Sequence, residues 1–290
     1  MTSSFAAAKN YYRLTKPGII YGNLLTATAG FLLASAGHVD LWLLLATLAG
    51  TSLVIASACS FNNYIDRGLD AKMTRTKRRA LVQGAIRGRD ALIFASILGL
   101  AGFLVLGLWV NAVVFGIGLA AFIDYIALYG LAKRRSVHGT LVGSIAGAAP
   151  VVAGYCTVTD RFDGGALILF LILALWQMPH FYAIAMYRFD DYKAAGLPVL
   201  PVKAGSRAAK TQIVLYITAF IAANVLLSIF GYTGYAYLII MTLLGLSWLR
   251  LGLQGFKAAN DKRWARQMFF YSLIIILSLS VMLSVGPLLP

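Results

Sequence analysis

Residues 91–130 read ALIFASILGLAGFLVLGLWVNAVVFGIGLAAFIDYIALYG, and Asp124 is the single charged residue among them. A membrane-spanning helix needs about 20 mostly apolar residues, so this stretch is long enough for two. The polar Asn111 lies near its middle and is the place where we divide it. The stretch therefore predicts a hairpin of two transmembrane helices.

The whole chain repeats this pattern, since 60% of its residues are hydrophobic and 12% are charged, against about 25% charge in ordinary soluble domains. The composition predicts one all-α integral-membrane domain over residues 1–290. We expect nine spanning helices, near 18–37, 42–64, 91–109, 112–130, 139–158, 166–187, 210–231, 235–252 and 268–288.

The basic residues fix the expected orientation. All but one of the 25 lysines and arginines lie in the N-terminal segment and in alternate loops, and Arg161 is the exception. Because such residues concentrate on the cytoplasmic side, we expect a cytoplasmic N-terminus and a periplasmic C-terminus. The net charge of +15 then reflects membrane orientation, and we expect no nucleic-acid partner.

The first candidate site is the series Asn62, Asp66 and Asp70 at the cytoplasmic end of the second predicted span. A spacing of four residues keeps the three side chains on one helical face, about 6 Å apart along the axis. Two carboxylates and an amide oxygen suit Mg²⁺, which completes its shell with water and phosphate oxygens. The other interpretation is a hydrated helix end whose acids pair with nearby cations.

Basic residues follow these acids directly, among them Lys72, Arg75 and Arg79. Cations beside metal-binding carboxylates favour a diphosphate, whose charge must be neutralised as substrate and as leaving group. Arg75 and Arg79 form the preferred pair, because they lie one turn apart if the segment is helical. Positive-inside charge explains part of the cluster as well.

A second acidic group, Tyr187-Arg188-Phe189-Asp190-Asp191-Tyr192-Lys193, lies at the same side of the membrane, after the sixth predicted span. Asp191 can hold a second Mg²⁺ on the far side of the diphosphate, because two acidic groups facing each other can clamp one anion through metals. Taken alone, the group indicates a solvated loop.

The chain resembles the UbiA-type intramembrane prenyltransferases, and within them the branch that acts on haem. The segments that carry the resemblance are LTKPGIIYGNLL (14–25), NNYIDRGLDAKMTRTKRRAL (62–81), KRRSVHGTLVGSIAGAAP (133–150) and WQMPHFYAIAMYRFDDYKAAGLPVLPV (176–202). The Asn/Asp/Asp series is typical of the whole superfamily, whereas WQMPHF and DYKAAG resemble the haem branch.

The resemblance implies site residues at the matching positions. The implied metal ligands are Asn62, Asp66, Asp70 and Asp191. The implied diphosphate-binding residues are Asn62, Lys72, Arg75, Arg79, Tyr129, Lys133 and Arg188. The implied catalytic residues are Asp66, Asp70, Lys133 and His180.

One departure from the family pattern concerns the second acidic group. The superfamily often has Asp-x-x-x-Asp there, but here Asp191 is followed four residues later by Ala195. Either Asp190 supplies the missing ligand or the second metal relies more on water and substrate.

Two further ionisable residues lie inside predicted spans. His180 lies about 10 Å from the inner end of its helix, and an ionisable group at such a depth indicates a functional site. We expect it on the haem side, as iron ligand or base, with Trp176 as a haem contact; a buried, hydrogen-bonded histidine is the alternative. Asp124 is expected to be neutral or paired with a basic residue such as Lys16.

The implied reaction transfers the farnesyl group of farnesyl diphosphate to a vinyl group of haem B, giving haem O in a bacterial inner membrane, with the site toward the cytoplasm and Mg²⁺ as cofactor. The implied partners are both substrates, the lipid bilayer, and haem-handling or terminal oxidase proteins. Two other functions fit less well. A sister enzyme that prenylates an aromatic acid such as 4-hydroxybenzoate lacks WQMPHF, and a transporter places its ionisable groups near the midplane.

Overall fold

The computed structural model describes residues 2–289, which fold into helices without a strand in that range. The elements are α1 (Thr2–Leu14), α2 (Pro17–Ser35), α3 (Leu41–Asp70), α4 (Gly88–Trp109), α5 (Ala112–Ile123), a π-helical turn (Asp124–Leu128), α6 (Tyr129–Arg135), α7 (Gly139–Thr159), α8 (Gly164–Tyr187), α9 (Phe189–Ala194), α10 (Leu200–Ile229), α11 (Tyr235–Gln254), a 3₁₀ turn (Gly255–Lys257), α12 (Asp261–Val285) and a last 3₁₀ turn (Gly286–Leu288).

Within the described range, nine helices are long and apolar enough to cross a membrane, which confirms the predicted number. The predicted split is also correct: α4 ends at Trp109, and the Asn111 side chain caps α5 by accepting a hydrogen bond of 2.8 Å from the backbone N–H of Val114. A side chain that does so satisfies one of the free N–H groups at a helix start. Asp40 and Asp163 cap α3 and α8 in the same way.

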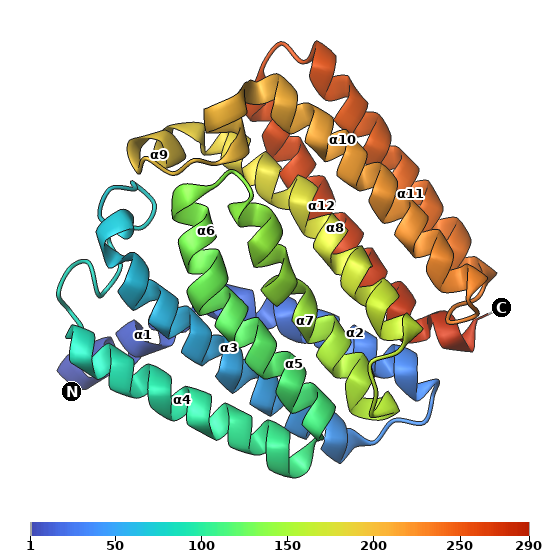
Figure 1. Cartoon of the computed structure of the whole chain (residues 1–290), viewed down its shortest axis with the longest axis horizontal. Coiled ribbons are helices and arrows are strands. Elements are labelled where there is room, and N and C mark those ends of the chain that lie inside the picture. The colour runs from blue at the N-terminus through green and yellow to red at the C-terminus, as the bar shows by residue number, and fades with distance from the viewer. Residues whose placement is uncertain (1, 290) are drawn as a thin grey trace.

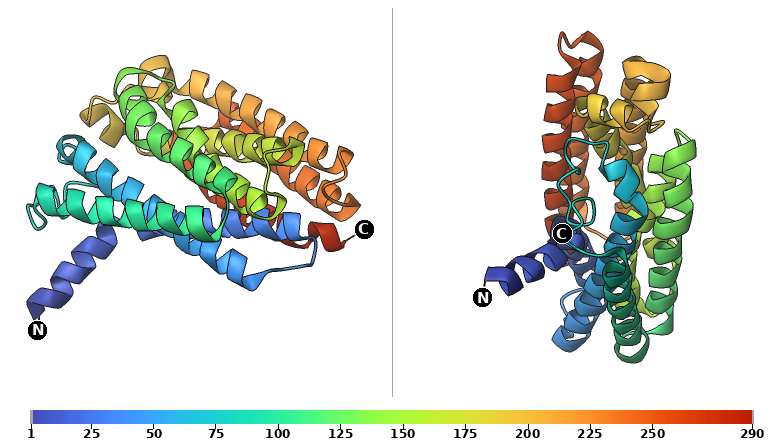
Figure 2. Two further views of the ribbon diagram at one scale, coloured as in Figure 1. Left: turned by 60° about the horizontal axis from the view of Figure 1, so that its bottom comes forward. Right: turned by 90° about the vertical axis from the view of Figure 1, so that its left-hand side faces the viewer.

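Several helices differ from the predicted boundaries. α3 continues to Asp70 instead of ending near residue 64. α10 begins at Leu200 instead of residue 210 and bends at Gly205, whose φ is 84°. α12 begins at Asp261 instead of residue 268, capped by Asn260. α1 was not predicted as an element, and in Figure 2 it projects away from the bundle. These stretches are helical but polar, so an apolar-run criterion misses them.

Small residues bring the central helices together. A Cβ atom on Gly30 of α2 would lie 2.0 Å from the carbonyl oxygen of Val151, and one on Gly154 of α7 would lie 1.9 Å from that of Ala27. Only glycine permits this backbone approach, as is usual where membrane helices pack closely. α2 and α7 therefore form a close pair inside the bundle.

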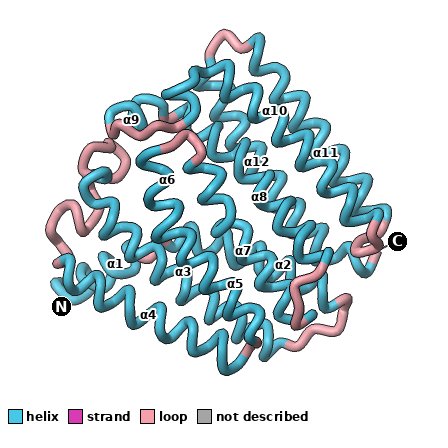
Figure 3. Tube along the Cα trace, viewed as in Figure 1, coloured by secondary structure: helices cyan, strands magenta, loops and turns pink. Residues whose placement is uncertain are grey.

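The helix ends that carry the site lie at one end of the bundle. Figures 1 and 3 show the C-terminal ends of α3, α6 and α8 at the same end of the bundle as α9 and the first turns of α10 and α12. Two connections meet there, residues 71–87 after α3 and residues 188–199 around α9. The opposite end holds the α2–α3, α4–α5, α7–α8 and α10–α11 connections.

Candidate active site

Asn62, Asp66 and Asp70 lie on the last turns of α3, as the spacing predicted, because α3 continues without a break to Asp70. All three are buried, with exposed fractions of 4%, 8% and 5%. A buried carboxylate is costly unless a cation or hydrogen-bond donors accompany it. These three side chains therefore face the interior of the protein and not bulk solvent.

Cations from α6 accompany Asp66. Lys133 donates from Nζ to Asp66 Oδ2, and Arg134 donates from Nη2 to Asp66 Oδ1 at 3.0 Å. The Lys133 ammonium also lies 4.8 Å from the centroid of the Tyr129 ring, one turn earlier on α6. Tyr129 and Lys133, both predicted for the diphosphate site, thus lie together, and Arg134 is an unpredicted second cation.

Two other cations reach α3 from other segments of the chain. Arg79 donates to Asp70 Oδ2 at 2.6 Å and to Asn63 Oδ1 at 2.9 Å. Lys16, which directly precedes α2, donates to Asn62 Oδ1 at 2.6 Å. Burial lowers the pKa of Lys16 to about 8. Each oxygen-bearing side chain of the series therefore has a basic partner.

Glycines of α7 set the position of α6. A Cβ on Gly139 would lie 2.6 Å from the Cα of Lys133, and one on Gly143 would lie 2.7 Å from Cδ2 of Tyr129. Because neither glycine has a side chain, α6 can lie directly against α7. This close packing holds Lys133 and Arg134 over the end of α3.

The second acidic group lies against the loop that follows Asp70. Asp191 Oδ1 accepts a hydrogen bond of 3.3 Å from the backbone N–H of Thr74. Met73, Ala195 and Leu197 form a small buried apolar cluster beside it. The two predicted motifs are thus neighbours through residues 71–87.

This cluster explains the departure at Ala195. The side chain is 6% exposed and packs with Met73 and Leu197, so an aspartate there would bury an unpaired charge in an apolar environment. Asp190 is exposed and lies 3.8 Å from Lys262 Nζ. The structure therefore offers Asp191 as the half-buried carboxylate of this group.

The remaining predicted cations are more exposed. Arg75 does not pair with Arg79 as a helical neighbour, because residues 71–87 form turns and not a helix. Arg75 lies near Tyr192 instead: burial raises the pKa of the Tyr192 phenol, and the Arg75 charge opposes this shift. Lys72 is exposed and, within residues 2–289, forms no ion pair. Arg188 stacks over Tyr187, with 5.2 Å from its Cζ to the ring centroid.

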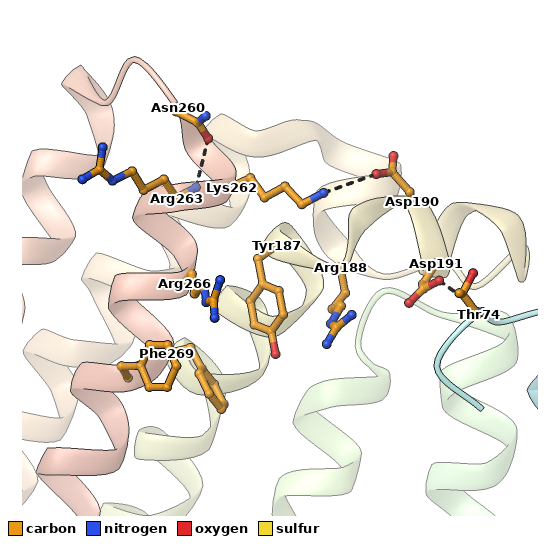
Figure 4. A pocket seen from close by; sticks show the side chains of 11 residues that line it. Thr74, Tyr187, Arg188, Asp190, Asp191, Asn260, Lys262, Arg263, Arg266 and Phe269 are labelled. Carbon is orange, nitrogen blue, oxygen red and sulfur yellow. Dashed lines mark hydrogen bonds and ion pairs between the residues drawn. The ribbon is translucent and has the colours of Figure 1, made fainter. Parts of the chain in front are cut away.

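A cavity of about 770 Å³ opens beside the second group, between the end of α8, α9 and the start of α12. Figure 4 shows Arg188 and Arg266 on either side of Tyr187, with Asp191 next to Thr74. Asp66 and Asp70 are not among its lining residues. The cavity therefore adjoins the site through Asp191 and Thr74, and not through α3.

His180 lies deeper in the bundle and is enclosed by aromatic rings. Its ring stacks on Trp176 at a centroid distance of 4.8 Å and lies 5.1 Å from Phe269. Its Nδ1 is 2.7 Å from Ser272 Oγ, and that hydroxyl donates its proton to the carbonyl of Phe269 at 2.6 Å. Ser272 must then accept from Nδ1–H, which leaves the lone pair of His180 on Nε2.

Trp176 has a defined place in the same cluster. Its Nε1 donates to the carbonyl of Ser272 at 2.9 Å, so its ring is held flat against His180 by α12. Trp176 therefore orients the histidine, whether or not it also contacts a substrate.

Asp124 is buried at the start of the π-helical turn. Its Oδ2 accepts a hydrogen bond of 3.2 Å from the N–H of Ala146 on α7, and Lys16 binds Asn62 instead. The suggested Asp124–Lys16 pair is therefore absent from the described part of the chain.

The sequence reasoning missed Asn63, Arg134 and Ser272, and it offered Lys16 to Asp124 instead of to Asn62. Lys16, Asn63 and Arg134 stand inside the quoted family segments, and the last two directly follow residues that were predicted. Their contacts join residues far apart in the chain, so spacing alone does not reveal them. No motif or spacing in the sequence singles out Ser272.

The donor set fits magnesium. Among residues 2–289, no three His, Cys, Asp or Glu side chains lie close enough to hold a metal by themselves. Mg²⁺ usually takes one or two carboxylates and receives its other oxygens from water and substrate phosphates. Asp66 and Asp70 supply two carboxylates, and Asn62 supplies an amide oxygen. With the cations nearby, this set meets the requirement for a metal that is bound together with a diphosphate.

A membrane bundle that gathers buried carboxylates and cations at one end is suited to bind a diphosphate through a metal ion. The chain belongs to the UbiA prenyltransferase family, whose model matches residues 23–274. The chain is 53% identical over 283 residues to a protoheme IX farnesyltransferase of Cronobacter sakazakii, covering 97% of this chain and 96% of that protein. It is 57% identical over 279 residues to protoheme IX farnesyltransferase 2 of Chromobacterium violaceum, covering 96% and 92%.

Solved structures share the fold at lower identity. A digeranylgeranylglyceryl phosphate synthase superposes with a TM-score of 0.80 at 20% identity, covering 97% of this chain and 99% of the other. A UbiA homolog from Archaeoglobus fulgidus, bound to DMAPP and Mg²⁺, superposes with a TM-score of 0.72 at 16% identity, covering 95% and 99%. The protein is thus a multi-pass membrane protein with the fold of these enzymes.

Proposed function

We propose that the protein transfers the farnesyl group of farnesyl diphosphate to a vinyl group of haem B, forming haem O and releasing diphosphate. The observation that carries the proposal is the buried set of Asn62, Asp66 and Asp70, each paired with a basic side chain. The similarity to protoheme IX farnesyltransferases over nearly the whole chain supports the choice of acceptor.

Asn62, Asp66 and Asp70 are the proposed ligands of one Mg²⁺, and Asp191 serves a second. When bound, Mg²⁺ would neutralise the diphosphate oxygens and so stabilise the leaving group. Lys133 and Arg79 already contact the two carboxylates, so they are placed to bind phosphate oxygens once the carboxylates bind metal. Tyr129, Lys72, Arg75 and Arg188 are proposed to complete the anion site.

The bond changes follow from these positions. The allylic C–O bond of farnesyl diphosphate breaks and its electron pair leaves with the diphosphate, which the cations hold. The allylic cation adds to the terminal vinyl carbon of haem B, and water then adds to the new cation with loss of one proton. The apolar helices around the site exclude other water until that step.

His180 is the proposed acceptor-side residue. Its Nε2 lone pair, set by the Ser272 hydrogen bond, either binds the haem iron or takes the proton released when water adds. The spectrum of bound haem distinguishes these roles, because an axial imidazole shifts the Soret band and a base does not.

We place the protein as one domain in a bacterial inner membrane, with the N-terminus and the site toward the cytoplasm. The bacterial sources of its relatives and the distribution of basic residues support this placement. Haem-handling or terminal oxidase proteins are the expected partners.

The test supplies the purified protein with Mg²⁺, farnesyl diphosphate and haem B and identifies the product by mass. The expected product is haem B plus one farnesyl group and one hydroxyl group. Turnover on 4-hydroxybenzoate in place of haem B would contradict the proposal. Asp66→Asn and Asp70→Asn should each abolish product, whereas Asp90→Asn, an exposed aspartate on α4, should not.

A further inference from the structure

The cavity beside α9 has the size of a small-molecule site. Its volume of about 770 Å³ falls in the range of about 300–1,000 Å³ that is usual for such sites. One wall comes from the end of α8 and from α9, and the other comes from the first turns of α12 (Figure 4).

Three basic residues of α12 line this cavity, Lys262, Arg263 and Arg266, and two of them share one face of the helix. Lys262 and Arg266 lie four residues apart and so share one face of the helix. In the described range Arg266 forms no ion pair, and its guanidinium group lies beside Tyr187. Lys262 contacts Asp190 at 3.8 Å, where both side chains are well exposed, and such a contact contributes little. Both cations are therefore available to an anionic ligand.

Arg263 lies between Lys262 and Arg266 in the sequence, but its side chain points in another direction. In Figure 4 its side chain extends away from Tyr187 and toward the outside of α12. Across the cavity, Arg188 belongs to the α8–α9 wall together with Asp191, the side that adjoins the proposed diphosphate site. The two walls thus carry separate basic groups.

Below the cations, aromatic rings line the cavity, and one of them contacts His180. Phe269 lines the cavity, and its ring lies 5.1 Å from the His180 ring and 5.7 Å from the Tyr187 ring. From Arg266 to Ser272, the partner of His180, α12 rises about 9 Å. That rise is comparable to the distance between the central iron of a porphyrin and its carboxylates.

We propose that the cavity receives the porphyrin with its two propionate carboxylates on Arg266 and Lys262 and its macrocycle against Phe269. The inference rests on the proposed function, in which haem B is the acceptor. The propionates occupy one edge of protohaem and the vinyl groups lie toward the opposite edge. Holding the carboxylates at the rim therefore turns a vinyl-bearing edge into the protein.

The test compares haem B with its dimethyl ester, which lacks the two negative charges. Each is titrated by its Soret absorbance into the detergent-solubilised full-length protein, without farnesyl diphosphate. The wild type should bind haem B more tightly than the ester. Arg266→Gln should weaken haem B binding about tenfold or more, the usual effect of losing a hydrogen bond between charged groups, and leave ester binding unchanged.

Steady-state kinetics give a second readout. Arg266→Gln and Lys262→Gln should raise the KM for haem B and leave the KM for farnesyl diphosphate within about twofold, while Arg188→Gln should raise the latter. Arg250→Gln is the matched control, because Arg250 is an exposed arginine on the neighbouring α11 outside the cavity. It should change neither constant.

Three results would overturn the inference. One is equal affinity of the wild type for haem B and for the ester. Another is an equal loss of affinity for haem B and for the ester in Arg266→Gln, which would indicate that Arg266 acts by packing and not by its charge. The third is an effect of Arg266→Gln seen only when anionic lipid is added, which would assign the cations to lipid headgroups. If haem B binds as described but is never farnesylated, the proposed function fails and the carboxylate site stands.

Discussion

Replacing Lys133 with methionine tests the pairing at the centre of the site. The change leaves Asp66 with Arg134 as its partner. The Lys133 and Asp66 side chains are 13% and 12% exposed, whereas Arg134 is 40% exposed. Removing one member of a buried ion pair costs about 3–5 kcal/mol. Because Arg134 remains, we expect the lower end, a loss of about 3 kcal/mol in the free energy of unfolding.

Adding Asp66→Asn to Lys133→Met should restore most of that stability, because the buried charge is gone; removing both members of such a pair is often nearly neutral. Turnover should stay at least about 100-fold below wild type in the single and the double variant, as when one stabilising donor is lost from an active site. The assays are thermal unfolding in detergent and haem O formation by mass.

Two outcomes would refute this reasoning. If Lys133→Met alone leaves the unfolding temperature unchanged, Lys133 and Asp66 are not a buried pair. If the double variant regains turnover with its stability, the two residues act only in folding, and Asp66 has no part in metal or diphosphate binding.

Three other substitutions test other parts of the account. Ser272→Ala leaves the Nδ1–H of His180 without an acceptor, so turnover should fall about 10–100-fold, as for other residues that orient a ligating histidine. Gly143→Ala places a methyl group 2.7 Å from the Tyr129 ring and should lower both turnover and unfolding temperature. Burial lowers the pKa of Lys16 to about 8, whereas the pKa of an unfolded lysine is about 10.4. Between these pH values the unfolded chain therefore holds one more proton, and the free energy of unfolding should rise as the pH rises. Lys16→Met should lack that rise.

Each of these three variants has a matched control substitution. Ser280→Ala removes another α12 hydroxyl, bonded to its own helix at Ile276, and should leave turnover intact. Gly116→Ala adds a methyl group where nothing lies within 4 Å. Lys9→Met removes an exposed lysine and should keep the rise in stability with pH. Equal effects of a variant and its control would contradict the role given to that residue.

The sequence predicts the membrane-spanning architecture well, because hydropathy and helix length are local properties. Asn111 marks a helix start by its polarity, and the structure uses it as a cap. The starts of α10 and α12 were missed for a related reason. Polar turns at the rim of a bundle remain helical in water, so each of these helices begins before its apolar run does.

The site was predictable only in part. The shared face of Asn62, Asp66 and Asp70 follows from helix geometry within one segment. Arg134 reaches Asp66 because α6 packs on α7 and the π-helical turn before it packs on α3. Lys16 reaches Asn62 across 46 residues of sequence. Such pairings depend on tertiary packing. Ala195 shows the same limit, since its place in an apolar cluster explains why the second motif lacks an aspartate there.

The most direct measurement of the central claim uses Mn²⁺ in place of Mg²⁺, detected by electron paramagnetic resonance, with farnesyl thiodiphosphate as a slowly reacting analogue. Immobilised Mn²⁺ should appear in the wild type when the analogue is present, and it should be lost in Asp66→Ala and Asp70→Ala but kept in Asp90→Ala. Undiminished analogue-dependent Mn²⁺ binding in both the Asp66 and Asp70 variants would contradict the claim that the end of α3 holds the metal and, through it, the diphosphate.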